Sequence, residues 1–583
     1  MDYKWTMVFL VYADFIDESG GSPSLNKNLL IELNSLLKDV VECDLDDARL
    51  DIYVVLSSVN YMSAAESGQF ELRNLTFIFK IEPGENGNNI FFIDDVDTTG
   101  MTEQDKENGN TSIQKKEKVA EAFRKIKEHA NSEDDKIFLM TWDHGSAFGI
   151  FKADDHRLQV LQTWEQIADN PEFAFVSRFT EIAFDFLKNE KKFQPPVDHE
   201  SKLLINNRVL SLKVNGGSKS NALINVVSDA MARESFRLSK EGTVFSLQPV
   251  SEKKPETLLN EEVSSLSRSL FSDDLPREEF AAIIAEGVAL ESKAVVEILT
   301  NDELASAIKE GFGYVHVLVM MNCYMMNLHT IYSMKGCVEF LVAPQGVIST
   351  PGYNYSDIIN YISKSSNRKL APGFVARECV DTCHNRKARK FALKMRNKTE
   401  GNFAKIDEWS IFSFGMKKDP SSEIAFLDSF VDDFHALVER LTVATTGSNL
   451  AVLLLHSKKF CFDFSDGSYH MTDIFHWLRN VEYIGQDILS PALRAEVAVL
   501  AGRVQNAFSN KSISYYAWRG RAYAKNTLGA VTRNQQSGIS IFFPHIPRGR
   551  VNIPFLDLKS DPLVSNHIKS WVPFIDSFHS FTG

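Results

Sequence analysis

A histidine and a cysteine each end a strand-like run of mostly apolar residues in this chain. Residues 136–144 end on His144, which is followed by Gly145, and residues 315–323 end on Cys323. Such runs are typical of strands that are buried on both faces of a parallel sheet. In open α/β sheets, reactive groups collect beyond the carboxyl ends of these strands. We therefore expect His144 and Cys323 to meet at one sheet edge, as a cysteine nucleophile and its histidine partner would.

The residues next to this pair suit acyl-transfer chemistry. Cysteine is a good nucleophile as the thiolate, and a predicted helix over residues 324–334 would favour that form with its positive amino end. His144 can accept and donate a proton near neutral pH. The backbone N–H groups of Gly145 and Cys323 could bind the oxyanion of a tetrahedral intermediate.

Taken singly, these residues also have structural interpretations. A cysteine at the end of a buried strand is often a small core residue, and a His-Gly pair is often a turn. The pair alone therefore leaves a catalytic role and a structural role open.

Alternating strand and helix patterns predict how the pair is positioned. Apolar runs and helical spacing recur through the first 150 residues and again from about residue 295, which indicates a mostly parallel sheet flanked by helices. The expected strands are 5–13, 50–56, 75–81, 89–93, 136–144, 315–323 and 338–343. The expected helices are 26–41, 112–130 and 300–309, the last opening with the capping-box pattern of Thr300 and Glu303.

The rest of the chain divides around this sheet. We expect residues 1–164 and 293–365 to form the two halves of the catalytic domain, and residues 366–583 to form a mixed α/β region with strands near 410–415, 450–455, 512–518 and 539–543. Residues 165–292 are an insertion, which is either a processing region or a helical subdomain that covers the sheet. Its part at 251–277 is charged and serine-rich, as in linkers and exposed loops.

Composition limits the class of protein. With 583 residues the chain is too long for one core, and its 44% hydrophobic and 24% charged residues are typical of a soluble globular protein. The net charge of −14 argues against a nucleic-acid partner. No apolar run reaches the roughly 18 residues that span a bilayer, and acidic Asp2 stands where a signal peptide carries basic residues, so we expect a cytoplasmic protein without a membrane partner.

Six segments resemble, in order, the clostripain family of cysteine peptidases (peptidase family C11, in the caspase-like clan). Residues 5–14 (WTMVFLVYAD) look like its first strand, and residues 138–149 (FLMTWDHGSAFG) are similar to its histidine motif. Residues 299–309 resemble the helix before its cysteine strand, and residues 322–327 (NCYMMN) resemble its D-A-C-L-M motif. Residues 338–355 and 538–544 (GISIFFP) are similar to later elements. None of these six segments lies in the insertion at residues 165–292.

This resemblance implies a caspase-like fold and a cysteine endopeptidase that acts on protein or peptide substrates. It makes Cys323 the nucleophile, His144 its partner, and the N–H groups of Gly145 and Cys323 the oxyanion hole. Family members are commonly cut between their two motifs. We therefore expect a zymogen cleaved within about residues 185–280, by itself or by an activating protease or sensor protein, with Lys192, Lys254, Arg268 and Arg277 as candidate sites.

Two departures from the family affect substrate choice. Family members usually have Asp two residues before the cysteine, beside a pocket for Arg or Lys, and here that position is Met321. An acidic loop that follows the next strand in the family is represented here by Gln345. Together with Asp143 and Glu339, which could supply a replacement charge, these are the candidate pocket residues. Selectivity for basic side chains is therefore in doubt.

We expect no metal cofactor. Some relatives bind calcium, and residues 94–100 imitate the start of an EF-hand loop, but Lys106 stands where the bidentate glutamate belongs. Cys379, Cys383 and His384 resemble half of a zinc site and have no second pair of ligands. The six cysteines in a chain of this length do not form a disulfide framework.

The main alternative is an inactive caspase-like scaffold or adaptor. The reactive pair argues against it, and the neutral residues Met321 and Gln345 keep it open. Another hydrolase or acyl-transfer reaction with the same dyad is a third alternative. Because bacterial peptidases of this clan inside cells often serve defence systems, a role in bacterial defence is an expectation that rests on the resemblance alone.

Overall fold

The computed structural model describes most of the chain. The described residues are 4–12, 16–17, 24–25, 27–46, 49–64, 70–84, 87–96, 112–130, 135–145, 147–151, 173–189, 198–205, 208–215, 221–228, 233–241, 244–249, 298–348, 351–364, 370–396, 409–416, 423–445, 448–459, 461, 471–509, 514–519, 538–543 and 561–575.

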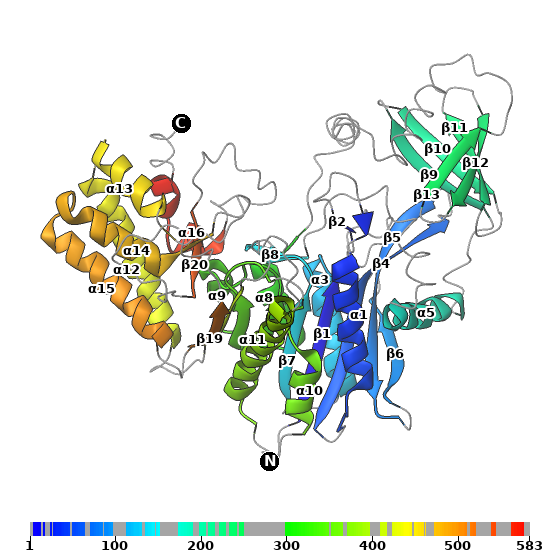
Figure 1. Ribbon diagram of the computed structural model, residues 1–583, viewed down its shortest axis with the longest axis horizontal. Helices are drawn as coiled ribbons and strands as arrows, with labels where there is room; N and C mark the ends of the chain where they lie inside the picture. The colour runs from blue at the N-terminus through cyan, green and yellow to red at the C-terminus, as the bar shows by residue number, and fades with distance from the viewer. Residues whose placement is uncertain are drawn as a thin grey trace.

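A nine-stranded mixed sheet forms the centre of the described structure (Figure 1). Five neighbouring strands in its middle are parallel, in the order β16 (Val338–Pro344), β15 (Val315–Met321), β7 (Lys136–Trp142), β1 (Trp5–Tyr12) and β4 (Leu50–Ala64). Antiparallel strands extend both edges: β5 (Phe70–Glu82) and β6 (Asn89–Asp95) beyond β4, and β17 (Trp409–Gly415) and β19 (Ser514–Arg519) beyond β16. The predicted α/β class with a mostly parallel sheet is confirmed.

The central strands are mostly apolar because helices cover both faces of the sheet. Successive side chains of β1 alternate between two core clusters: Val8 and Leu10 lie in one, and Met7 and Phe9 lie in the other.

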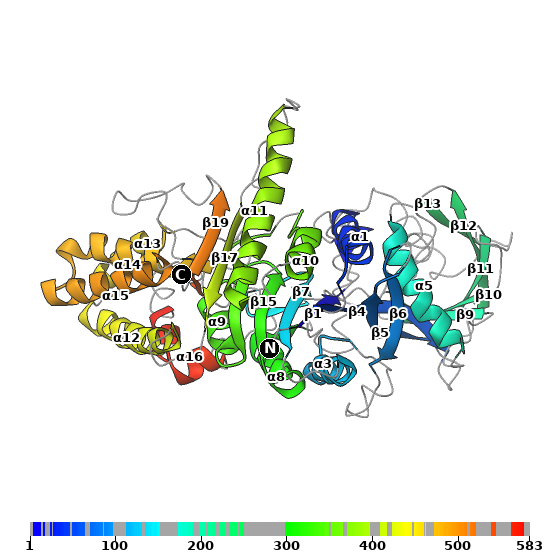
Figure 2. The same ribbon diagram turned by 90° about the horizontal axis from the view of Figure 1, so that it is seen from below.

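Figure 2 shows the helices in two layers. The first cluster includes side chains of α3 (Lys116–Ala130), α8 (Asn301–Gly311) and α9 (Leu328–Met334). The second includes side chains of α1 (Lys27–Glu42), α5 (Ala174–Asn189), α10 (Tyr355–Ser363) and α11 (Pro372–Arg396).

The expected capping box of α8 is present. Thr300 Oγ1 accepts a hydrogen bond from Glu303 N, and the Glu303 carboxylate accepts one from Thr300 N. This cap fixes where the chain enters the helix that leads into β15. Immediately before this helix, β14 (Leu299–Thr300) pairs with β8 (Gly149–Ile150). β8 follows the loop after β7 that contains His144, which we call the histidine loop.

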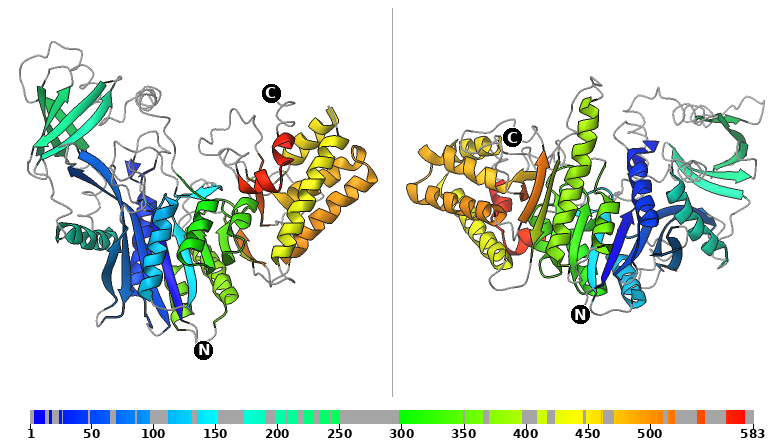
Figure 3. Two further views of the ribbon diagram at one scale, coloured as in Figure 1. Left: turned by 180° about the vertical axis from the view of Figure 1, so that it is seen from behind. Right: turned by 60° about the horizontal axis from the view of Figure 1, so that its bottom comes forward.

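The insertion contains β structure, so the alternative of a helical subdomain is wrong. It holds a separate five-stranded antiparallel sheet, which lies at the opposite end of the molecule from the C-terminal helices (Figure 3). Its strands are β9 (Asp198–Ile205), β10 (Arg208–Asn215), β11 (Asn221–Ser228), β12 (Arg233–Glu241) and β13 (Val244–Pro249). In contrast, α5 belongs to the core, because the Phe179 ring packs against Phe79 at 5.1 Å between centroids.

The C-terminal region adds a layer of helices beside β17 and β19 (Figure 1). These helices are α12 (Glu423–Ala444), α13 (Ser448–Lys459), α14 (Ile474–Ile484), α15 (Pro491–Ser509) and α16 (Pro562–Asn566), with the 3-10 turn η3 (Gly485–Asp487). Short strand pairs complete the described elements: β18 (Met471–Asp473) with β20 (Ser540–Phe542), and β2 (Ile16–Asp17) with β3 (Ser24–Leu25).

The strand predicted at 450–455 is wrong, because these residues lie within helix α13. A short apolar run does not distinguish a strand from a buried helical turn. The other strands predicted in this region are confirmed as β17, β19 and β20. Within the described part of the chain, no helix combines the length and apolar character that crossing a membrane requires.

Candidate active site

The two reactive residues follow neighbouring parallel strands at the same sheet edge. Trp142 and Met321, the last residues of β7 and β15, are partners in the register of the two strands. His144 and Cys323 each lie two residues further along. His144 is exposed, whereas Cys323 is half-buried and packs against both core clusters. The sequence prediction that both residues reach one edge is therefore confirmed.

Gly145 brings the histidine loop into contact with the cysteine. A Cβ atom placed on Gly145 would lie 2.7 Å from Cys323 O and 2.9 Å from Cys323 N. Only glycine permits this approach of two backbones. The backbone at Gly145 therefore touches the backbone at Cys323, although the two residues are far apart in the sequence.

Both reactive residues have a neighbour with a positive φ angle. Asp143, before the histidine, has φ 144°, and Tyr324, after the cysteine, has φ 64°. Such values are unfavourable for residues with a side chain and occur where surrounding contacts enforce them, often at functional sites. At Tyr324 these contacts include a backbone hydrogen bond of 2.9 Å from its N–H to Gly346 O.

A fully buried Asn322 links the two strand ends. Its Nδ2 donates to Asp143 O at 2.9 Å and to His144 O at 3.2 Å, and its Oδ1 accepts from Thr141 Oγ1 at 2.6 Å. The sequence analysis assigned Asn322 no role of its own. A polar residue at the end of an otherwise apolar strand was the available signal, because buried amides need partners.

The helix after the cysteine starts later than predicted, so one sequence argument is wrong. Helix α9 begins at Leu328, and Asn327 caps it by accepting a hydrogen bond from Thr330 N. Cys323 therefore does not directly precede a helix, and the helix amino end is not adjacent to its thiol. The left-handed backbone at Tyr324 explains the delay, since a helix cannot pass through that conformation.

Met321, the residue two before the cysteine, is buried under the loop 351–354. Its sulfur lies 3.5 Å from the Tyr355 hydroxyl, and Gly352 packs directly against its thioether. The Tyr355 hydroxyl also donates to Glu32 Oε1 at 3.1 Å. Burial raises the pKa of Tyr355 well above its usual value, with Glu32 adding to the shift, so this hydroxyl remains a donor.

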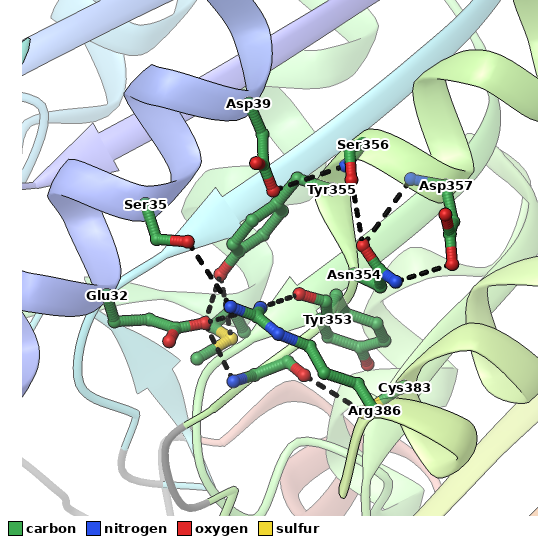
Figure 4. Close-up of polar contacts among 12 residues, drawn as sticks. Glu32, Ser35, Asp39, Tyr353, Asn354, Tyr355, Ser356, Asp357, Cys383 and Arg386 are labelled. Carbon is green, nitrogen blue, oxygen red and sulfur yellow. Dashed lines mark hydrogen bonds and ion pairs between the residues drawn. The ribbon is translucent and has the colours of Figure 1, made fainter. Parts of the chain in front are cut away.

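Glu32 is the centre of a buried polar network behind Met321 (Figure 4). Its Oε1 also accepts a 2.7 Å hydrogen bond from Gly352 N and forms a 3.1 Å ion pair with Arg386 Nη1. Arg386 in turn donates to Tyr353 O and to Ser35 Oγ. The network therefore joins α1 and α11 to the loop that covers Met321.

The other candidate pocket residues lie in different places. Asp143 is buried next to His144. Gln345, just beyond β16, is fully buried, and its Nε2 donates to Asp473 Oδ2 at 2.8 Å. Glu339 is the second residue of β16, whose first residue Val338 pairs with Val315 at the start of β15. The structure thus places Glu339 near the amino ends of the parallel strands, whereas Cys323 lies beyond their carboxyl ends, so Glu339 does not line a pocket beside Cys323.

The remaining sequence candidates lie outside the site or outside the described residues. All four predicted processing positions and Lys106 belong to segments that the structure does not describe. Cys379 and Cys383 are buried in α11, and burial raises the pKa of both thiols. Among the residues that the structure describes, no group of three or more His, Cys, Asp or Glu side chains is arranged to hold a metal ion.

Comparison with protein-family models finds a match for the segment that contains Cys323. The sequence model of the clostripain family matches residues 283–431, which include Cys323. Over these residues the chain is therefore similar to the clostripain family. The recognition made from the sequence motifs is therefore confirmed, and the clostripain match spans the strand, loop and helices on the cysteine side of the site.

Solved structures of C11 proteases resemble the whole chain at low sequence identity. A secreted C11 cysteine protease from Bacteroides thetaiotaomicron, in complex with an irreversible peptide inhibitor, is 10% identical with a TM-score of 0.42, over 98% of this chain and 99% of that chain. An inactive zymogen C11 protease from Parabacteroides distasonis is 10% identical with a TM-score of 0.39, over 93% of each chain. No curated protein matches the chain by sequence.

Proposed function

We propose that the chain is a cysteine endopeptidase in which Cys323 attacks the peptide carbonyl and His144 transfers the protons. The observation that carries this proposal is the contact between the two loops: Gly145 lies against the backbone of Cys323, and Asn322 is hydrogen-bonded to the carbonyl of His144. The clostripain-family match around Cys323 supports the same chemistry.

The proposed reaction has two steps. In the first, the Cys323 thiolate forms a bond to the carbonyl carbon, and the N–H groups of Gly145 and Cys323 stabilise the oxyanion. The C–N bond then breaks, the amine leaves with a proton from His144, and a thioester remains. In the second step, His144 takes a proton from water, the resulting hydroxide attacks the thioester, and the carboxylic acid and the thiolate are released.

Covalent labelling tests the dyad. A peptidyl acyloxymethylketone should label the wild-type protein at Cys323, and the label should disappear in Cys323→Ala and fall strongly in His144→Ala. The second variant keeps the nucleophile, so its loss of labelling reports the histidine. A wild-type protein that is folded and already cut in the insertion, yet unlabelled and inactive on a peptide library, would instead support the scaffold alternative.

We also propose that the chain is made as a zymogen and activated by a cut in the insertion. The support is topological. The insertion lies between the segments that carry His144 and Cys323, and strand β8 before the insertion pairs with strand β14 after it. Lys192, Lys254, Arg268 and Arg277 are the candidate sites, for self-cleavage or for a partner protease.

Intact-mass measurement during incubation tests self-cleavage. Wild type should convert into two fragments whose masses sum to the whole chain plus one water, whereas Cys323→Ala should stay whole. If both proteins remain uncut while wild type still cleaves peptides, activation by self-cleavage is excluded.

A further inference from the structure

Asn322 is a buried polar side chain between two residues that the proposed reaction uses. It directly precedes Cys323, and its amide reaches across to the loop of His144. No solvent contacts it, because its exposed fraction is 0%. Each polar atom of the amide has a partner in the neighbouring strand or its loop, as a buried amide requires.

The pattern of hydrogen bonds needs an amide in particular. Two backbone carbonyls, of Asp143 and His144, require donors, and the Thr141 hydroxyl donates to the remaining oxygen of Asn322. An aspartate would present oxygen to both carbonyls, and an alanine would leave them without this partner. The amide is therefore matched to the histidine loop through its two N–H groups.

The hydrogen bonds from Asn322 Nδ2 hold the backbone of Asp143 and His144 in an unfavourable conformation. Asp143 has φ 144°, a value that costs free energy for a residue with a Cβ atom. The Nδ2 group binds the carbonyl of the Asp143–His144 peptide and the carbonyl of the following His144–Gly145 peptide, so neither peptide can rotate while both bonds persist. The His144 carbonyl is also held by Phe151 N at 3.0 Å.

We propose that Asn322 is a positioning residue that fixes His144 relative to Cys323. It acts through the backbone of the histidine loop and does not touch the substrate. This inference rests on the proposed dyad. Because a nearby imidazolium favours the thiolate, correct placement of His144 should set the pH at which Cys323 becomes reactive.

The test is the pH profile of Cys323 alkylation by iodoacetamide, followed by mass spectrometry of the peptide that contains it. Wild type is compared with His144→Ala, Asn322→Ala, Asn322→Asp and Thr141→Val. The valine variant removes one hydrogen bond of the same amide and leaves both bonds to the histidine loop. At pH 6.5 both Asn322 variants should react about tenfold or more slowly than wild type, approaching His144→Ala, and Thr141→Val should stay within about threefold of wild type.

The outcomes separate the inference from the function on which it rests. If wild-type Cys323 reacts as an ordinary thiol and His144→Ala changes nothing, the dyad itself is refuted. If His144→Ala suppresses reactivity at low pH but Asn322→Asp does not, the positioning role is refuted. A profile that moves equally in Thr141→Val would show general loosening and would also overturn it. Asn322→Asp is nearly isosteric with the native residue, so it keeps the test usable if the alanine variant does not fold.

Discussion

Replacing Arg386 with methionine is expected to loosen the loop that covers Met321. The Arg386 guanidinium neutralises the carboxylate of Glu32, whose side chain is only 4% exposed. Removing one member of a buried ion pair typically costs about 3–5 kcal/mol, because the remaining charge has no compensation. Methionine retains most of the apolar stem, so packing within α11 changes little.

A second carboxylate adds to this cost. Burial raises the pKa of Asp39, and the Arg386 charge opposes that increase. Without the guanidinium, the repulsion between Glu32 and Asp39 is opposed only by the weaker effects of Ser356 N and Lys38 on Asp39. The expected effect is therefore local, at α1 and at the loop it holds.

Hydrogen exchange measured by mass spectrometry can detect this change directly. The Gly352 N–H donates to Glu32 Oε1 at 2.7 Å, so its exchange follows opening of the loop. If the full 3–5 kcal/mol is lost locally, exchange should accelerate by about a hundredfold to a few thousandfold. Glu32→Gln combined with Arg386→Met removes both charges and should recover part of the protection.

Arg440→Met is the matched control. Arg440 pairs with Glu496 across an interface where both side chains are about half exposed, 54% and 44%. Such surface pairs contribute little, so exchange at Gly352 should not change. Equal exchange at Gly352 in the Arg386 and Arg440 variants would refute the reasoning.

Three further outcomes are expected. Gly145→Ala should abolish peptidase activity while the protein still folds, because the new Cβ would lie 2.7 Å from Cys323 O; activity near wild type, with an unchanged circular dichroism spectrum, would contradict this contact. Burial, reinforced by the Lys136 charge, lowers the pKa of His316 from 6.5 to about 4. Between these pH values the unfolded chain binds a proton at His316 and the folded chain does not. The free energy of unfolding should therefore fall as the pH drops from about 6.5 towards 4. The urea midpoint should depend less on pH in His316→Gln. Brief iodoacetamide treatment of the native protein should label Cys323 before the buried thiols, because burial raises the pKa of three of these thiols to about 11. Peptide mapping that finds Cys323 and the buried cysteines modified at equal rates would contradict their burial. These buried thiols are Cys43, Cys337 and Cys383.

The parallel strands and the meeting of His144 with Cys323 could be predicted from the sequence. Buried strands have a strong local signature, and the carboxyl ends of neighbouring parallel strands lie at one edge by geometry. The cap of α8 was also predictable, since Thr300 and Glu303 are close in the sequence and act on each other. In each case local chemistry determines the structure.

The network behind Met321 could not be predicted, because Glu32 and Arg386 are 354 positions apart and nothing local connects them. The late start of α9 depends on contacts of Tyr324 with the loop after β16, which override the helical pattern of the residues that follow. The antiparallel sheet of the insertion was not predicted, because its short strands of mixed polar and apolar residues adjoin segments with the composition of linkers.

Because β8 pairs with β14, the sheet edge that carries His144 and Cys323 does not depend on a continuous backbone between these two residues. Leu299 pairs with Ile150, and Ile150 bridges back to Gly145 beside the histidine. A chain interrupted between residues 190 and 297 would still be joined by this pair and by the pairing of β7 with β15, from Phe138 with Val317 to Trp142 with Met321. The two pieces would then behave as a noncovalent heterodimer whose assembly depends on buried surface. Evolution can therefore lengthen, replace or sever this stretch and leave the chemistry in place.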